Sequence, residues 1–141
     1  MKNTGKASEK EWEEVMEAKY GKLLNLHDLL DTSNIKKENL KSFVNPAPAD
    51  YVVTANHEMF YAEIKSCSSK TSFGFSQFTP SQNACMLKQT NAGGQYWVYI
   101  HRLETDEWYR VPASLILKTK HNNIKSLKWK DLSAYSWGTK Q

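Results

Sequence analysis

The sequence predicts an α/β domain built around a small central mixed β-sheet flanked by helices. Apolar residues recur at helical spacing near the N-terminus, whereas residues 51–66 and 95–111 are rich in β-branched and aromatic side chains between turn signals. A second helical segment follows Thr79-Pro80, between those two regions. The resulting order of helix, strand pair, helix, strand and strand is typical of an α/β domain.

The first helix is expected to begin near Ser8. Ser8 is suited to be its N-cap, and Glu11 lies three residues further on, as in a capping box. An apolar stripe follows at helical spacing, made of Trp12, Val15, Met16, Tyr20 and Leu23. Gly21 ends or loosens this helix, and residues 23–30 are expected to form a second helical piece.

The next segment separates the first helix from the first strand. Residues 31–34 are expected to be a loop, and the basic residues 35–43 form either a short helix or a protruding arm. The segment Asn45-Pro46-Ala47-Pro48 then forces the chain into an extended conformation, because proline excludes a continuing helix.

A hairpin is expected from Tyr51–Ala55 and Met59–Ser66, with a turn at residues 56–58. Because side chains alternate along a strand, Glu63 and Lys65 should share one face and Ile64 should point the other way. Residues 66–70 are expected to form a polar loop and residues 71–78 an irregular aromatic stretch.

The second half of the chain continues the alternation of helix and strand. A helix with Thr79 as N-cap should run to about Thr90 and stop at residues 92–94, which contain two glycines. Strands are expected at residues 95–101 and 106–111, followed by a short helix at residues 112–117. Residues 124–137 have no clear period, and the segment 119–141 has no evident role.

Composition excludes some classes of protein. The net charge of +4 is mild and is compatible with a polyanionic partner, and the stretch between Glu63 and Glu104 contains no acid. No apolar run approaches the roughly 18 residues of a membrane span, so no membrane partner is expected. Two cysteines are too few for a disulfide framework, which indicates a reducing, cytoplasmic setting. The four histidines lack the spacing of zinc ligands, which argues against a zinc site.

One group of residues suggests chemistry. The hairpin can place Asp50, just before its first strand, beside Glu63 and Lys65 on its second. Two adjacent carboxylates repel each other unless a cation lies between them, and hard oxygen ligands suit Mg²⁺. A bound metal would activate a water and Lys65 would stabilise developing charge, as phosphodiester hydrolysis requires. Taken alone, however, Glu-x-Lys on a strand is more often an exposed ion pair.

The wider pattern resembles the RecU-type Holliday-junction resolvases of the restriction-endonuclease-like superfamily, whose motif is Asp, a variable gap and Glu-x-Lys. The matching residues are Asn3, Gly5 and Glu9 at the start, Asp50-Tyr51, Glu63-Ile64-Lys65, Thr71-Ser72-Phe73, Gln82 and Met86. The resemblance covers roughly residues 3–16 and 48–111 and implies a restriction-endonuclease-like fold, with residues 1–141 as a single nuclease domain.

The resemblance also implies roles for individual residues. Asp50, Glu63, the Ile64 carbonyl and Glu9 would hold Mg²⁺, with Mn²⁺ as a possible substitute, and Glu9 would act through water. Lys65 would be the catalytic lysine, and Gln82 would position the site or contact the DNA backbone. The residues expected to contact DNA are Lys36, Lys37, Lys70, Thr71, Ser72 and Lys88. The roles of Glu9 and Gln82 each have a structural alternative. Glu9 could be a helix-start residue favoured by the helix dipole, and Gln82 could be a solvent-facing helix residue.

The expected function is therefore cleavage of four-way DNA junctions by a homodimer, whose twofold symmetry supplies matching sites for two equivalent strands. Two alternatives stay open: a phage or mobile-element nuclease with relaxed specificity for duplex or flapped DNA, and a catalytically silent DNA-binding protein. The family's long basic stalk has no obvious counterpart here, although residues 31–47 are a candidate for a shortened one.

Overall fold

The structure, a computed structural model, describes residues 4–29 and 47–138. The loop expected at 31–34, the arm or helix at 35–43, and Lys36 and Lys37 lie outside the described residues. The helices are α1 (Thr4–Tyr20), α3 (Pro80–Asn91) and α4 (Ala113–His121), with short 3-10 segments η1 (Gly21–Leu23), η2 (Phe75–Gln77) and η3 (Trp129–Tyr135). The strands are β1 (Leu24–Asp28), β2 (Tyr51–Ala55), β3 (Glu58–Cys67), β4 (Ser72–Gly74), β5 (Tyr96–Arg102), β6 (Glu107–Pro112) and β7 (Ser126–Lys128).

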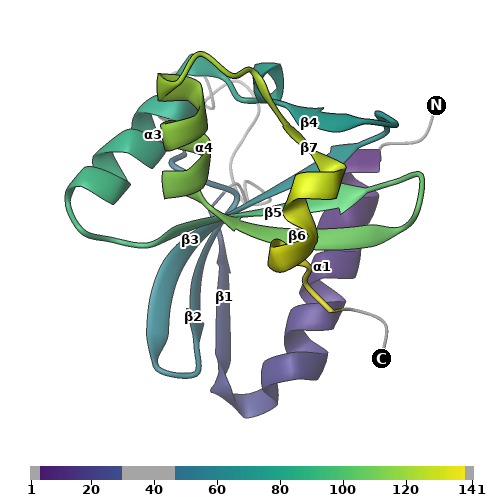
Figure 1. Cartoon of the computed structure of the whole chain (residues 1–141). Coiled ribbons are helices and arrows are strands. Elements are labelled where there is room, and N and C mark those ends of the chain that lie inside the picture. The colour runs from purple at the N-terminus through teal and green to yellow at the C-terminus, as the bar shows by residue number, and fades with distance from the viewer. Residues whose placement is uncertain (1–3, 30–46, 139–141) are drawn as a thin grey trace, which may run out of the picture.

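Five strands form the central sheet in the order β1-β2-β3-β5-β6. The β3–β5 pair is parallel and the other pairs are antiparallel, so the sheet is mixed, as predicted. Helix α1 covers one face, while α3, α4 and the β4–β7 ribbon cover the other (Figure 1). The predicted α/β class with helices flanking a small mixed sheet is therefore confirmed.

Each face of the sheet has its own apolar core. Under α1, the buried Trp12 and Met16 pack with Tyr51, Phe60 and Tyr99. The opposite core is larger and contains side chains from β5, α3, α4, the β4–β7 ribbon and η3, among them Phe73, Met86, Val98, Ile116 and Leu132. Strand β3 contributes to both cores, since Ile64 lies in the α1 core and Cys67 in the other. The alternation predicted for β3 is thus confirmed.

The first helix begins earlier than predicted, and the segment that follows it is a strand and not a second helix. Helix α1 starts at Thr4, so Ser8 is no N-cap; its hydroxyl lies in the second turn, 2.8 Å from His101 Nδ1. The helical piece expected at residues 23–30 is wrong, because residues 24–28 form strand β1. Gly21, with φ +52°, ends the helix, and the partly buried Leu24 and Leu26 alternate with exposed residues in β1, which pairs with β2.

Two further segments are more regular than predicted. The aromatic stretch at 71–78 contains β4 and η2, and the tail at 124–137 contains β7 and η3. Strand β4 pairs with β7, so each three-residue strand depends on a partner distant in the sequence. The helix expected at 112–117 exists but continues to His121. Within the described part of the chain, no helix is both long and apolar enough to span a bilayer.

Candidate active site

Three neighbouring strands bring acidic residues to one end of the sheet. Asp28 is the last residue of β1, Asp50 directly precedes β2, and Glu63 lies in β3. Tyr51 pairs with both Asp28 on one side and Ala62 on the other, so these acids occupy adjacent strands at neighbouring positions. The hairpin of β2 and β3 therefore does what the sequence predicted, in placing Asp50 next to Glu63.

Asp50 is fixed by backbone contacts on both sides. Its Oδ2 accepts a hydrogen bond from the Ile64 amide at 2.9 Å, which holds the carboxylate against β3. The chain just before it is anchored because the buried Tyr96 hydroxyl donates to the Pro48 carbonyl at 2.7 Å. The sheet therefore orients the Asp50 carboxylate.

Lys65 and Gln82 complete the site around Glu63. The Lys65 ammonium lies 3.3 Å from Glu63 Oε2 and donates to the Gln77 carbonyl at 2.9 Å and to Gln82 Oε1 at 3.1 Å. The Gln82 amide nitrogen donates in turn to Glu63 Oε2 at 3.0 Å. Glu63 is 2% exposed, so its charge is almost fully removed from bulk water. Gln82 thus links the lysine to the carboxylate and is not a solvent-facing helix residue.

The start of α3 explains why Gln82 points into the site. Thr79 caps the helix, with its Oγ1 accepting from the Gln82 amide at 3.1 Å. Gln82 Oε1 accepts from the Thr79 amide at 3.0 Å, which closes a capping box. This reciprocal pair fixes the Gln82 rotamer before any substrate arrives. The predicted Thr79 N-cap is confirmed.

Burial and mutual repulsion disfavour the charged carboxylates. Burial raises the pKa of Glu63 to about 7, with the nearby Asp50 charge adding to the shift and Lys65 opposing it. Burial also raises the pKa of Asp50, although the Ile64 amide and Lys65 partly offset this. Two neighbouring carboxyl groups that share the influence of one ammonium, that of Lys65, lack full compensating positive charge.

Glu9 approaches the same acids from α1. Its pKa is raised to about 7, first by burial and then by the charges of Asp50 and Asp28. Its carboxylate is thus electrostatically coupled to the site. Among the described residues, however, no three acidic or His/Cys ligand atoms converge here within 4.8 Å, so Glu9 does not directly complete a three-carboxylate cage. An indirect role for Glu9, through water, stays a prediction.

Asp28 is a member of the site that sequence reasoning missed. The segment that carries it was expected to be helical, which would have placed it elsewhere. The alternation of Leu24 and Leu26 with polar residues was the available signal for a strand ending in an acid. Its charge raises the pKa of both Glu9 and Asp50.

The residues present fit a hard divalent cation. Asp50 and Glu63 supply oxygen ligands with excess negative charge, and their raised pKa values show that a positive charge would be favoured there. Both line a cavity of about 170 Å³ with Ala47, Ala49, Thr79, Ser81 and Gln82. That volume accommodates an ion with its waters but not a nucleotide, so the scissile phosphate would have to approach from the open side.

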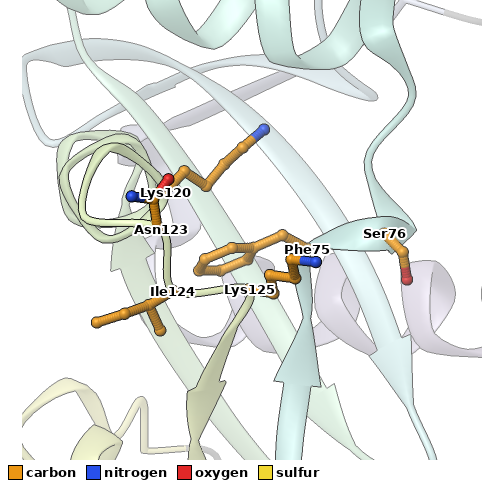
Figure 2. Close-up of a pocket in the computed structure, with 6 residues that line it drawn as sticks. All are labelled: Phe75, Ser76, Lys120, Asn123, Ile124 and Lys125. Atoms are coloured by element: carbon orange, nitrogen blue, oxygen red, sulfur yellow. The ribbon is translucent and has the colours of Figure 1, made fainter.

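Four of the residues expected to contact DNA lie among the described residues, on separate elements of the fold. Lys70 and Thr71 line a cavity of about 480 Å³ with Arg102, Lys128, Trp129 and Lys130. Ser72 belongs to β4, while Lys88 is exposed in the last turn of α3. A further cavity of about 520 Å³ contains no candidate catalytic residue and has the Phe75 ring between Ser76 and the 120–125 segment (Figure 2). Its lining includes Lys120 and Lys125.

Comparisons with known proteins identify the family and a similar fold. The sequence model of the family described as "RecU: Recombination protein U" matches residues 24–140. Among solved structures, the chain is similar to Archaeoglobus fulgidus Hjc, "a Holliday junction resolvase from an archaeal hyperthermophile". The TM-score is 0.52 at 12% sequence identity, over 91% of this chain and 92% of that chain, so the similarity concerns the fold. No curated protein matches the chain.

Proposed function

Since the chain belongs to the RecU family of recombination proteins, we propose that it is a metal-dependent endonuclease that cleaves four-way DNA junctions. The observation that carries the proposal is the buried Glu63 carboxylate beside Asp50, with one lysine and one glutamine fixed on it. The solved relative in fold is itself a junction resolvase, which favours a branched substrate over a linear one.

In this proposal Asp50 and Glu63 hold Mg²⁺, with the Ile64 carbonyl as a further ligand and Glu9 acting through water. Mn²⁺ would be expected to substitute. A cation there would lower the pKa of a bound water and stabilise negative charge on the phosphoryl oxygens. The protein's own part is to hold the ligands rigidly and to exclude bulk water from Glu63, which is 2% exposed.

Lys65 would orient the attacking water and neutralise charge that develops on the phosphate. Its ammonium is already held by the Gln77 carbonyl and Gln82 Oε1, so little ordering is needed when substrate binds. Gln82 acts as a positioning residue, because its amide group joins Lys65 to Glu63.

DNA would be held by basic residues beside the site. Lys70 and Thr71 share a cavity with Lys128 and Lys130, which supports phosphate binding by part of the C-terminal segment. Ser72 and Lys88 stay candidate contacts. The chain would act as one nuclease domain in a homodimer, because a four-way junction offers two equivalent strands for cleavage. We expect it to act in the cytoplasm.

The proposal is tested with a labelled four-way junction, a linear duplex of the same sequence and a single strand, each in Mg²⁺ or EDTA. Symmetric nicking of the junction in Mg²⁺ alone supports junction cleavage. Broad degradation of all three would favour a relaxed nuclease, and retardation without cutting would favour a silent DNA-binding protein.

A matched pair of lysine variants assigns the chemistry. Lys65→Ala should abolish cutting while retaining junction binding, because it removes the ammonium next to Glu63 but leaves the surface lysines. Lys22→Ala, at the exposed end of η1, should cut normally. Equal cutting by both variants would remove Lys65 from the mechanism.

A further inference from the structure

A second set of metal-ligand side chains lies on the opposite face of the sheet from Glu63 and Lys65. Glu11 of α1, His101 of β5 and Asp106 of the β5–β6 turn have ligand atoms that all lie within 4.8 Å of one another. They meet where α1 packs beside the end of the β5–β6 hairpin (Figure 1). Nothing in the proposed nuclease mechanism uses these three side chains.

The distances suit a small ion. His101 Nε2 lies 2.7 Å from Asp106 Oδ1 and 3.9 Å from Glu11 Oε2. Metal–ligand bonds of about 2.0–2.2 Å in a tetrahedral site place ligand atoms roughly 3.3–3.6 Å apart. Carboxyl rotations that move the Asp106 oxygen by about 0.6–0.9 Å and the Glu11 oxygen by about 0.3–0.6 Å would therefore open room for a cation.

The surroundings already orient the ligands. His101 Nδ1 is 2.8 Å from Ser8 Oγ, and the imidazole stacks on Trp108 with centroids 4.4 Å apart and planes inclined by 4°. The Trp108 indole nitrogen donates to Glu11 Oε2 at 2.7 Å. Such outer hydrogen bonds fix the tautomer and direction of metal-binding side chains. The Ser8 contact and the stacking on Trp108 thereby restrain the imidazole in an orientation in which Nε2 faces both carboxylates.

Two other interpretations explain the cluster less well. Ser8, His101 and Asp106 have the order of a hydrolase triad, but Ser8 is 2% exposed and so is inaccessible to a substrate. In a hydrogen-bonded network without metal, His101 Nε2 contacts Asp106 Oδ1 and the Trp108 indole donates to Glu11 Oε2, which leaves two carboxylate groups facing one imidazole nitrogen. A cation satisfies both carboxylates and the nitrogen together.

We propose that Glu11, His101 and Asp106 bind one divalent transition-metal ion of the Zn²⁺ class. An imidazole ligand with two carboxylates selects such an ion over Mg²⁺, which prefers an all-oxygen shell. The Glu11 and Asp106 side chains are 39% and 49% exposed, so the ion has access from solvent, and water completes its coordination. The scattered histidine positions concealed this site in the sequence, because its ligands come from three separate elements.

The ion would be structural. It ties α1 to the β5–β6 hairpin, and Glu9, whose carboxylate is coupled to Asp50, lies two residues before Glu11 on the same helix. Occupancy would therefore restrain the helix that carries Glu9, without contact with the reacting phosphate. The site is separate from the proposed Mg²⁺ site, because its ligands face the other side of the sheet.

The test measures Zn²⁺ binding by the full chain after chelator treatment, using equilibrium dialysis and the visible absorption of substituted Co²⁺. All variants are made in an Asp50→Asn, Glu63→Gln background, so that the proposed catalytic site takes up no ion. One equivalent of Zn²⁺ should bind to that background. Adding Asp106→Asn or Glu11→Gln should weaken binding by about tenfold or more, since each removes a charged ligand.

The matched control is Glu104→Gln, which removes an exposed carboxylate of the same turn and should leave Zn²⁺ affinity unchanged. Circular dichroism confirms that each variant is folded, and Glu11→Gln still offers an oxygen to the Trp108 indole. Absence of binding in the background, or equal affinity in all variants, would overturn the proposal. Because no cleavage is measured, this result is independent of the proposed nuclease activity.

Discussion

Replacement of Glu63 by glutamine should make the metal-free protein more stable at neutral and alkaline pH. Glu63 is 2% exposed, and its folded-state pKa is raised from 4.5 to about 7 by burial and by Asp50. Glutamine resembles the neutral acid in size, and its side-chain oxygen keeps the acceptor used by Lys65 and Gln82. The substitution therefore removes a costly charge while it preserves the hydrogen bonds.

The magnitude follows from linkage between protonation and folding. A carboxyl whose pKa is higher in the folded state binds its proton more tightly there, so stability is lost as pH rises from the unfolded pKa through the folded pKa. Each pKa unit corresponds to about 1.4 kcal/mol, so the shift of Glu63 costs roughly 3 kcal/mol once pH exceeds about 8. At pH 5 the group is protonated in the folded protein, and the cost falls to about 1 kcal/mol or less.

The assay is urea unfolding of wild type and Glu63→Gln in EDTA, followed by tryptophan fluorescence at pH 5 and pH 8. We expect the variant to be more stable by about 2–3 kcal/mol at pH 8, with a much smaller difference at pH 5. Mg²⁺ should stabilise the wild type at pH 8 and the variant far less. A variant less stable than wild type at pH 8 would show that Glu63 is compensated in the metal-free protein and would refute the reasoning.

Three further predictions concern other parts of the molecule. Gln82→Leu should lower kcat/KM for cleavage by about 10- to 100-fold, because it removes hydrogen bonds to two charged groups, whereas Gln89→Leu on the same helix should have little effect. Lys70→Ala should weaken binding of junction and duplex alike and reduce the slope of log affinity against log salt by about 1, measured by titration at several salt concentrations. Phe73→Ala should destabilise the protein by about 3–5 kcal/mol in urea, because Phe73 is fully buried; a much smaller loss would mean that the β4–β7 ribbon packs weakly.

The sequence predicted the parts of the fold that depend on local patterns. The β2–β3 hairpin and the α3 start are set by alternation, turn residues and the Thr79-Pro80 cap, all of which act over a few residues. Strand β1 and the β4–β7 ribbon were missed because their stability comes from partners far away in the chain. A three-residue strand such as Ser72–Gly74 has no periodicity long enough to be recognised.

The central residues of the candidate site were predictable for a related reason, and the residues that the sequence did not reveal also have a physical explanation. Asp50, Glu63 and Lys65 lie on one hairpin, so their proximity follows from strand pairing alone. Asp28 joins them only because residues 24–28 form an edge strand, a consequence of tertiary pairing with β2. Glu11, His101 and Asp106 come from a helix, a strand and a turn, and no spacing in the sequence reveals that these elements meet.

In the proposed mechanism, the same burial that destabilises the metal-free site would prepare it for catalysis. Removing Glu63 from water raises its pKa and costs folding free energy, yet it also strengthens every electrostatic interaction of that carboxylate with a cation. A more exposed pair of carboxylates would be less costly to fold and would bind metal less tightly. In the metal-free protein, Lys65 and Gln82 reduce the free-energy cost of burying Glu63. The Lys65 ammonium lies 3.3 Å from Glu63 Oε2, and the Gln82 amide nitrogen donates to the same oxygen at 3.0 Å. In the proposed mechanism these contacts would hold the ligand oxygens in place before the ion binds, so the reacting phosphate would meet a site that requires little rearrangement.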